Sequence, residues 1–88
     1  MMNSEEIVNV VQKALPGAMV TVKDLTGTKD HLRVTVVASQ FEGKMMIEQH
    51  RLMYDIMNPH MEANGGGIHA LSLATYTPAD WEKFGKSA

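Results

Sequence analysis

The chain has 88 residues and a mass of 9.7 kDa, which is enough for one domain with one hydrophobic core, so we expect residues 1–88 to form a single domain. Hydrophobic residues make up 44% of the chain and charged residues 20%, proportions that exclude a disordered, collagen-like or coiled-coil protein. The formal net charge of −2 argues against a surface that holds phosphates by charge alone. Because the chain has no cysteine, it offers no disulfide, no thiolate nucleophile and no thiolate metal ligand.

The start of the chain carries no recognisable targeting signal. Residues Met1 to Glu6 lack the basic and apolar regions of a secretory peptide, and Glu5 and Glu6 argue against a transit peptide. No apolar run approaches the ~20 residues that a membrane-spanning helix needs. The sequence therefore predicts a soluble, cytoplasmic protein that does not associate with membranes.

The first element is predicted to be an amphipathic helix that ends at Pro16-Gly17. Asn3 or Ser4 can cap its start, and Glu5 and Glu6 favour the positive end of the helix dipole. Apolar residues follow at helical spacing: Ile7, Val10, Val11, Ala14 and Leu15.

A β-hairpin is predicted next, with strands at Met19–Lys23 and His31–Ser39 joined by a turn at Asp24–Asp30. The second of these strands alternates between an apolar face and a more polar one. The apolar face consists of Leu32, Val34, Val36 and Ala38, and the other of His31, Arg33, Thr35 and Val37.

A long helix is predicted from about Lys44 to Ala63, ended by Asn64 and the glycines at 65–67. Pro59 is expected to kink this helix or to split off its last turn. Five of the eight methionines lie in this segment, and we interpret them as core packing rather than as a binding stripe. The predicted apolar stripe consists of Met45, Met46, Leu52, Met53, Ile56 and Met57.

The remaining segment predicts a third strand and a short final helix. The strand is expected at Ile68–Tyr76, and its small residues Ala70, Ser72 and Ala74 suggest a face that a helix approaches closely. Thr77 to Asp80 has the pattern of a helix start, with a capping residue followed by proline. The order αββ-α-βα predicts an α+β fold with a three-stranded mixed sheet, in which the third strand is parallel to one hairpin strand.

Four histidines are the candidate ligands or general bases: His31, His50, His60 and His69. Their spacing matches no zinc motif, and for any one of them a surface or structural role is the more common case. No nucleophile or acid–base constellation appears, so the sequence does not predict an enzyme. Residue chemistry alone indicates a soluble α+β binding module.

Four motifs, taken in order, resemble the BolA family. They are Phe41-Glu42-Gly43, the stretch Gln49 to Tyr54, the stretch Ile68 to Leu73, and the stretch Tyr76 to Trp81. The resemblance extends from about Leu15 to Phe84. It implies a KH-like fold of the second type, which agrees with the predicted order of elements.

The resemblance also implies a function in iron–sulfur and iron homeostasis and in redox or stress regulation. BolA-like proteins partner monothiol glutaredoxins, and the pair holds a bridging [2Fe-2S] cluster, with thiolates from glutaredoxin and glutathione. The family's histidine in the Ile-His-Ala-Leu motif matches His69. A second ligand comes from in or near the hairpin loop, where this chain offers only His31, whose side chain could equally face solvent beside Arg33. Imidazole ligands would raise the cluster potential relative to an all-thiolate site and make the cluster sensitive to pH.

A further expectation concerns the long helix. Family members often carry Arg-His-Arg where this chain has Gln49-His50-Arg51, and losing one cation would weaken contacts with phosphates or an acidic partner. His50 and Arg51 are candidates for a partner or nucleic-acid face, although a solvated face shared with Glu48 and Asp55 is about equally expected.

The alternative function is a nucleic-acid-binding transcriptional regulator that uses the KH-like fold. The net charge and the absence of a G-x-x-G loop at Gln40 to Lys44 argue against it. Homodimer formation and weak DNA binding stay open at this point.

Overall fold

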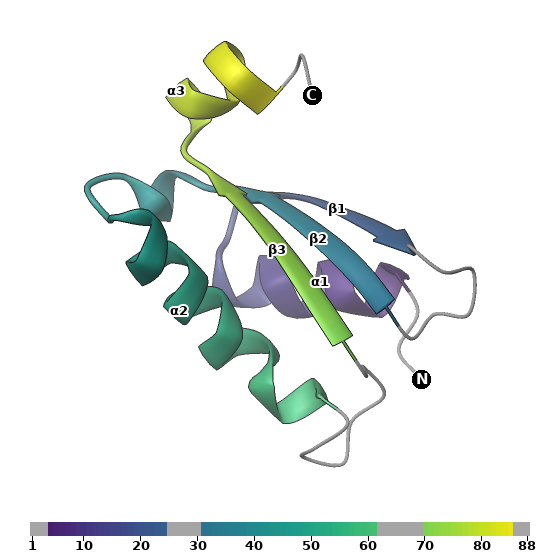
Figure 1. The fold of residues 1–88 in the computed structure, drawn as a ribbon. Helices are drawn as coiled ribbons and strands as arrows, with labels where there is room; N and C mark the ends of the chain where they lie inside the picture. The colour runs from purple at the N-terminus through teal and green to yellow at the C-terminus, as the bar shows by residue number, and fades with distance from the viewer. Residues whose placement is uncertain (1–3, 25–30, 62–69, 86–88) are drawn as a thin grey trace.

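Two helices cover one face of a three-stranded sheet, and a short helix follows the last strand (Figure 1). The computed structural model describes residues 4–24, 31–61 and 70–85. The helices are α1 (Ser4–Ala14), α2 (Met46–Met57) and α3 (Pro78–Asp80), and α3 continues as a π-helical turn at Trp81–Gly85. The strands are β1 (Met19–Asp24), β2 (His31–Val37) and β3 (Ala70–Tyr76), and 3₁₀ turns lie at Ser39–Phe41 and Asn58–His60. The predicted α+β class and order of elements are confirmed.

Helix α1 packs its apolar stripe against the sheet and ends where the sequence predicts. Ile7 and Val11 have no exposed surface, and the backbone of Leu15 still bonds to Val11 at 2.8 Å. The chain then turns at Pro16-Gly17, where Gly17 has a φ of 84°, a conformation that costs glycine little and other residues more. This turn brings β1 back across α1.

The sheet has the order β1-β2-β3, with β1 antiparallel to β2 and β2 parallel to β3. The predicted parallel pairing of the third strand with a hairpin strand is therefore confirmed. Strand β2 lies at the centre, and its alternation is as predicted: Leu32, Val34 and Val36 are buried, whereas His31 and Arg33 are exposed.

The prediction that a helix packs on the small-residue face of the third strand is wrong. Leu71 and Leu73 of β3 pack against the core, and in the sheet they lie beside Leu32 and Val34 of β2. Paired residues of adjacent strands lie on the same face of the sheet, so the leucines of β3 lie on the buried face of β2. Burying leucines also removes more apolar surface from water than burying alanine and serine would. The opposite face of β3 carries Ala70, Ser72 and Ala74.

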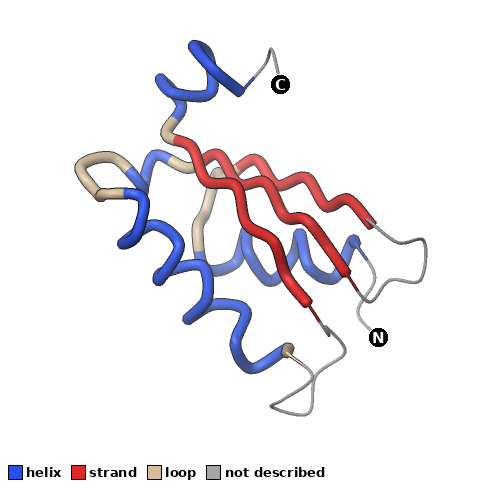
Figure 2. The backbone as a smooth tube through the Cα atoms, in the orientation of Figure 1, coloured by secondary structure: helices blue, strands red, loops and turns tan. Residues whose placement is uncertain are grey.

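Helix α2 is shorter than predicted. It runs from Met46 to Met57, not from Lys44 to Ala63, and a separate 3₁₀ turn at Asn58–His60 follows it (Figure 2). Pro59 lies in that turn, which confirms that the proline splits off the last turn of the helix. The predicted cap at Asn64 and the glycines, the predicted strand start at Ile68, and most of the predicted hairpin turn lie outside the described residues.

The predicted apolar stripe of α2 is buried only in its second half. Met53 and Met57 have no exposed surface, and with Gln49 they form the buried line of the helix at four-residue spacing. Met45 and Met46, which were predicted to belong to the same stripe, are 70% and 65% exposed. Met45 precedes the helix, and the buried line begins only at Gln49, so these two methionines do not serve the core.

Candidate functional site

The beginnings of β2 and β3 form the first candidate site. His31 is the first residue of β2 and is exposed, and in the sheet it pairs with Ala70, the first residue of β3. A shallow pocket of about 200 Å³ lies here, lined by His31, Leu32, Ala70, Leu71 and Ser72. Because β2 and β3 are parallel, both strands begin at the same end of the sheet.

His69, the other predicted ligand, lies outside the described residues, so its pairing with His31 stays a prediction. The alternation along β2 puts His31 on the same face as Arg33, which agrees with the alternative that the His31 side chain faces solvent. That exposure also suits a ligand for a metal shared with another protein. Among the described residues, no three His, Asp or Glu side chains gather closely enough to hold a metal ion.

The second candidate site lies on α2, where His50 and Arg51 have different surroundings. His50 is half-buried and, with Met46, lines a pocket of about 180 Å³ against residues 73–76 of β3. Arg51 is exposed. Helix α2 thus presents an imidazole next to the edge strand β3 and a cation directed away from the core.

Gln49 does not lie on an outward face. Its side chain is only 7% exposed, and its Oε1 accepts a hydrogen bond of 2.8 Å from the Thr75 hydroxyl of β3. Its Nε2 donates to the backbone oxygen of Lys44 at 3.0 Å. The expectation that glutamine here weakens contacts with a partner is therefore not supported, because this side chain links α2 to the sheet.

An exposed apolar patch at the start of α2 was missed from the sequence. It consists of Met45, Met46 and Ile47, each at least 64% exposed. Glu48 fixes this first turn, since its Oε1 accepts a 2.9 Å hydrogen bond from the Met45 backbone N–H. The sequence contained one signal for it. Met45, Met46 and Ile47 come before Gln49, which is the first of the buried positions that recur every four residues along α2. We call these three residues the α2 patch.

No helix in the described part of the chain is long and apolar enough to cross a membrane. His60 is half-buried in the 3₁₀ turn after α2.

Together these features define a small two-layer α+β domain with candidate binding surfaces at a sheet edge and on one helix. The family profile described as BolA-like protein matches residues 6–80. The chain belongs to the BolA family.

Solved structures support the same assignment. The chain is 31% identical to a bolA protein homologue from Coxiella burnetii, with a TM-score of 0.75 over 93% of this chain and 99% of that one. BolA1 from Arabidopsis thaliana is 27% identical, with a TM-score of 0.75 over 91% of this chain and 98% of that one. The fold predicted from the family resemblance is confirmed.

Curated relatives match over a shorter stretch. A BolA-like protein from Dictyostelium discoideum is 42% identical over 57 residues, which are 65% of this chain and 48% of that protein. Human BolA-like protein 1 is 40% identical over 57 residues, 39% of its length. The matched part thus spans less than half the length of these relatives.

Proposed function

We propose that this chain is an adaptor, without catalytic activity of its own, that binds a monothiol glutaredoxin and shares a bridging [2Fe-2S] cluster with it. The observation that carries the proposal is the family membership over residues 6–80 together with His69 at the histidine position of the Ile-His-Ala-Leu motif. The role of such a complex is in iron–sulfur and iron homeostasis and in redox or stress regulation.

The sheet register supports the choice of His31 as the second ligand. Ala70, the residue that directly follows His69 in the sequence, pairs with His31 at the start of β2. His31 is exposed, as a residue must be to reach a metal that a second protein also binds. The cluster, when bound, supplies one-electron chemistry, and imidazole ligands shift its potential upward.

Because the chain has no cysteine, it cannot supply the thiolate ligands of the proposed cluster. Both thiolates must come from outside this chain, one from glutaredoxin and one from glutathione, and this chain contributes neutral imidazoles. When the cluster is bound, His69 and His31 would hold one of its irons. We assign the α2 patch, with His50 and Arg51 beside it, to the partner as a second contact, because exposed apolar side chains gain from being covered. It lies near the Tyr76 end of β3, whereas His31 lies at the Ala70 end, so the partner has to span the length of this strand.

Anaerobic reconstitution tests the proposal. We expect the purified chain, mixed with a monothiol glutaredoxin, glutathione, iron and sulfide, to give a visible circular dichroism spectrum distinct from that of the glutaredoxin homodimer. The His69→Ala variant should lose this spectrum, and His31→Ala should lose or alter it.

His60→Ala is the matched control, since it removes an imidazole that the proposal does not use. A mixture whose spectrum equals that of glutaredoxin alone would contradict the proposed partnership. A spectrum that is distinct but insensitive to His69→Ala would keep the partner and reject the ligand.

A further inference from the structure

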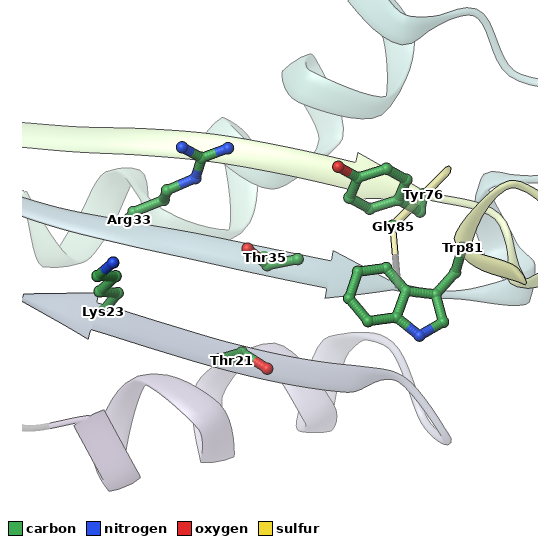
Figure 3. Close-up of a pocket in the computed structure, with 7 residues that line it drawn as sticks. All are labelled: Thr21, Lys23, Arg33, Thr35, Tyr76, Trp81 and Gly85. Atoms are coloured by element: carbon green, nitrogen blue, oxygen red, sulfur yellow. The ribbon is translucent and has the colours of Figure 1, made fainter. Parts of the chain in front are cut away.

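The sheet face opposite α1 and α2 carries a pocket that the proposed cluster site does not use. It has a volume of about 300 Å³, at the lower end of the range for small-molecule sites. Figure 3 shows two cationic side chains at one end of it and the Trp81 ring at the other, with two threonines between them. The pocket thus has a charged end, a hydroxyl-bearing middle and an aromatic end.

Lys23 and Arg33 form the charged end. They are direct partners in the β1–β2 register, and both are exposed. Like charges placed directly opposite each other destabilise a sheet. An anion bound between them would relieve this repulsion and accept hydrogen bonds from both.

The aromatic end is held in place by its surroundings. The Trp81 and Tyr76 rings meet edge to face, with their centroids 5.3 Å apart and an angle of 66° between their planes. The indole also packs directly on Gly85, where a Cβ would overlap the ring. The half-buried indole therefore has a fixed position from which a second planar ring can stack on it.

The middle of the pocket sets the spacing between these two ends. Thr21 and Thr35 are register partners, two residues along their strands from Lys23 and Arg33. Two strand residues span about 7 Å, a separation comparable with that between the ribose and the terminal phosphate of a nucleoside diphosphate. The threonine hydroxyls lie where the hydroxyls of a sugar would need hydrogen-bond partners.

We propose that this face binds a nucleoside diphosphate, with the base against Trp81, the ribose over Thr21 and Thr35, and the phosphates between Lys23 and Arg33. All three parts of the ligand then meet a matching part of the pocket. A nucleoside without phosphate or a phosphate without base would each use only one end.

Trp81 is the chain's only tryptophan, so its fluorescence reports on this pocket alone. We expect ADP to change the Trp81 emission saturably, and to bind about tenfold or more tightly than adenosine or pyrophosphate. The variants Lys23→Gln and Arg33→Gln should each weaken ADP binding by about tenfold. Lys13→Gln, on α1 at the other side of the sheet, is the matched control and should leave the affinity unchanged.

Three outcomes would overturn the proposal. The first is no saturable change of emission with ADP. The second is equal affinity for ADP and pyrophosphate, which would mean that the cations alone bind the anion. The third is binding of a single-stranded oligonucleotide but not of ADP, which would mean a polymer site. Circular dichroism of each variant establishes that the fold is retained, and calorimetry provides a second measure of affinity.

Discussion

At the scale of single residues, Gln49 is the clearest departure from what the sequence suggested. By position in its motif it belonged to a partner-facing group, yet its amide is buried and bonded to Thr75 and to the Lys44 backbone. A buried amide leaves costly unsatisfied groups when it loses its partners, so this position contributes to stability. The helix and the edge strand β3 are fixed to each other partly by this contact.

The variant Thr75→Val tests that contact. It should lower the free energy of unfolding by about 1–2 kcal/mol, because the buried Gln49 oxygen loses its donor. Urea unfolding measures the change. The double variant with Gln49→Leu should cost less than the two single changes added together, because the two residues act through one hydrogen bond.

Thr21→Val is the matched control, as it removes an exposed hydroxyl from the opposite face of the sheet. Its effect on stability should stay within about 0.5 kcal/mol. Strict additivity of the Thr75 and Gln49 changes would show that the two side chains do not depend on each other.

At the scale of elements, the sequence predicts the order, the hairpin, the parallel pairing of β3 and the end of α1. These follow from local signals: the alternation around Val34, the turn at Pro16-Gly17 and the helix start at Thr77, whose hydroxyl accepts a 3.2 Å hydrogen bond from Asp80. The prediction of which face of β3 is buried failed because it depends on the packing of one element against another. Leu71, and not Ser72, lies on the buried face because the register with β2 determines which face of β3 is buried. The local sequence pattern does not contain this register.

The candidate site divides in the same way. Sequence motifs nominate His69 and His31 as metal ligands, and this stays a prediction; the structure shows only that His31 pairs with Ala70. The pairing of Lys23 with Arg33 and the position of Trp81 over the sheet could not be predicted, since both require the three-dimensional register. The exposure of Met46 could not be predicted either, because its helical spacing from Met53 placed both on the same predicted apolar stripe.

Helix α2 should show two separable roles when its methionines are changed. Met53→Ala should lower the free energy of unfolding by about 2–5 kcal/mol, because it leaves a cavity in a fully buried position. Met46→Ala should change it by no more than about 0.5 kcal/mol, because this side chain is largely exposed. Chemical denaturation of both variants measures the difference.

A change at Met46 also tests the surface that we assign to the partner. Met46→Glu should weaken binding to the glutaredoxin, measured by calorimetry, while leaving the unfolding midpoint unchanged. Unchanged affinity in this variant would remove the α2 patch from the interface. A large loss of stability would instead mean that Met46 belongs to the core.

At the scale of the whole molecule, the absence of cysteine determines what the chain would contribute to the proposed function. A chain without thiolates can take part in iron–sulfur chemistry only by sharing a site, and its own contribution is then an imidazole that must be neutral to bind iron. An all-thiolate cluster has no imidazole ligand to lose to a proton. The complex should therefore respond to pH differently from the glutaredoxin homodimer.

Acidification should release the cluster from the mixed complex before it releases the cluster from the homodimer. Protonation of a ligating imidazole competes with the iron, so the occupied fraction should fall as the pH falls. Following the visible absorbance of both complexes during matched titrations measures this order. Loss of both clusters over the same pH range would contradict imidazole ligation.

The composition of the complex provides the most direct test of the shared site. Native mass spectrometry of the anaerobically reconstituted mixture reports the mass of the intact assembly. We predict one copy of this chain, one glutaredoxin, one glutathione and one [2Fe-2S] cluster, and we predict that this species disappears with His69→Ala. A cluster found only in glutaredoxin dimers, with this chain free or bound without iron, would contradict the account.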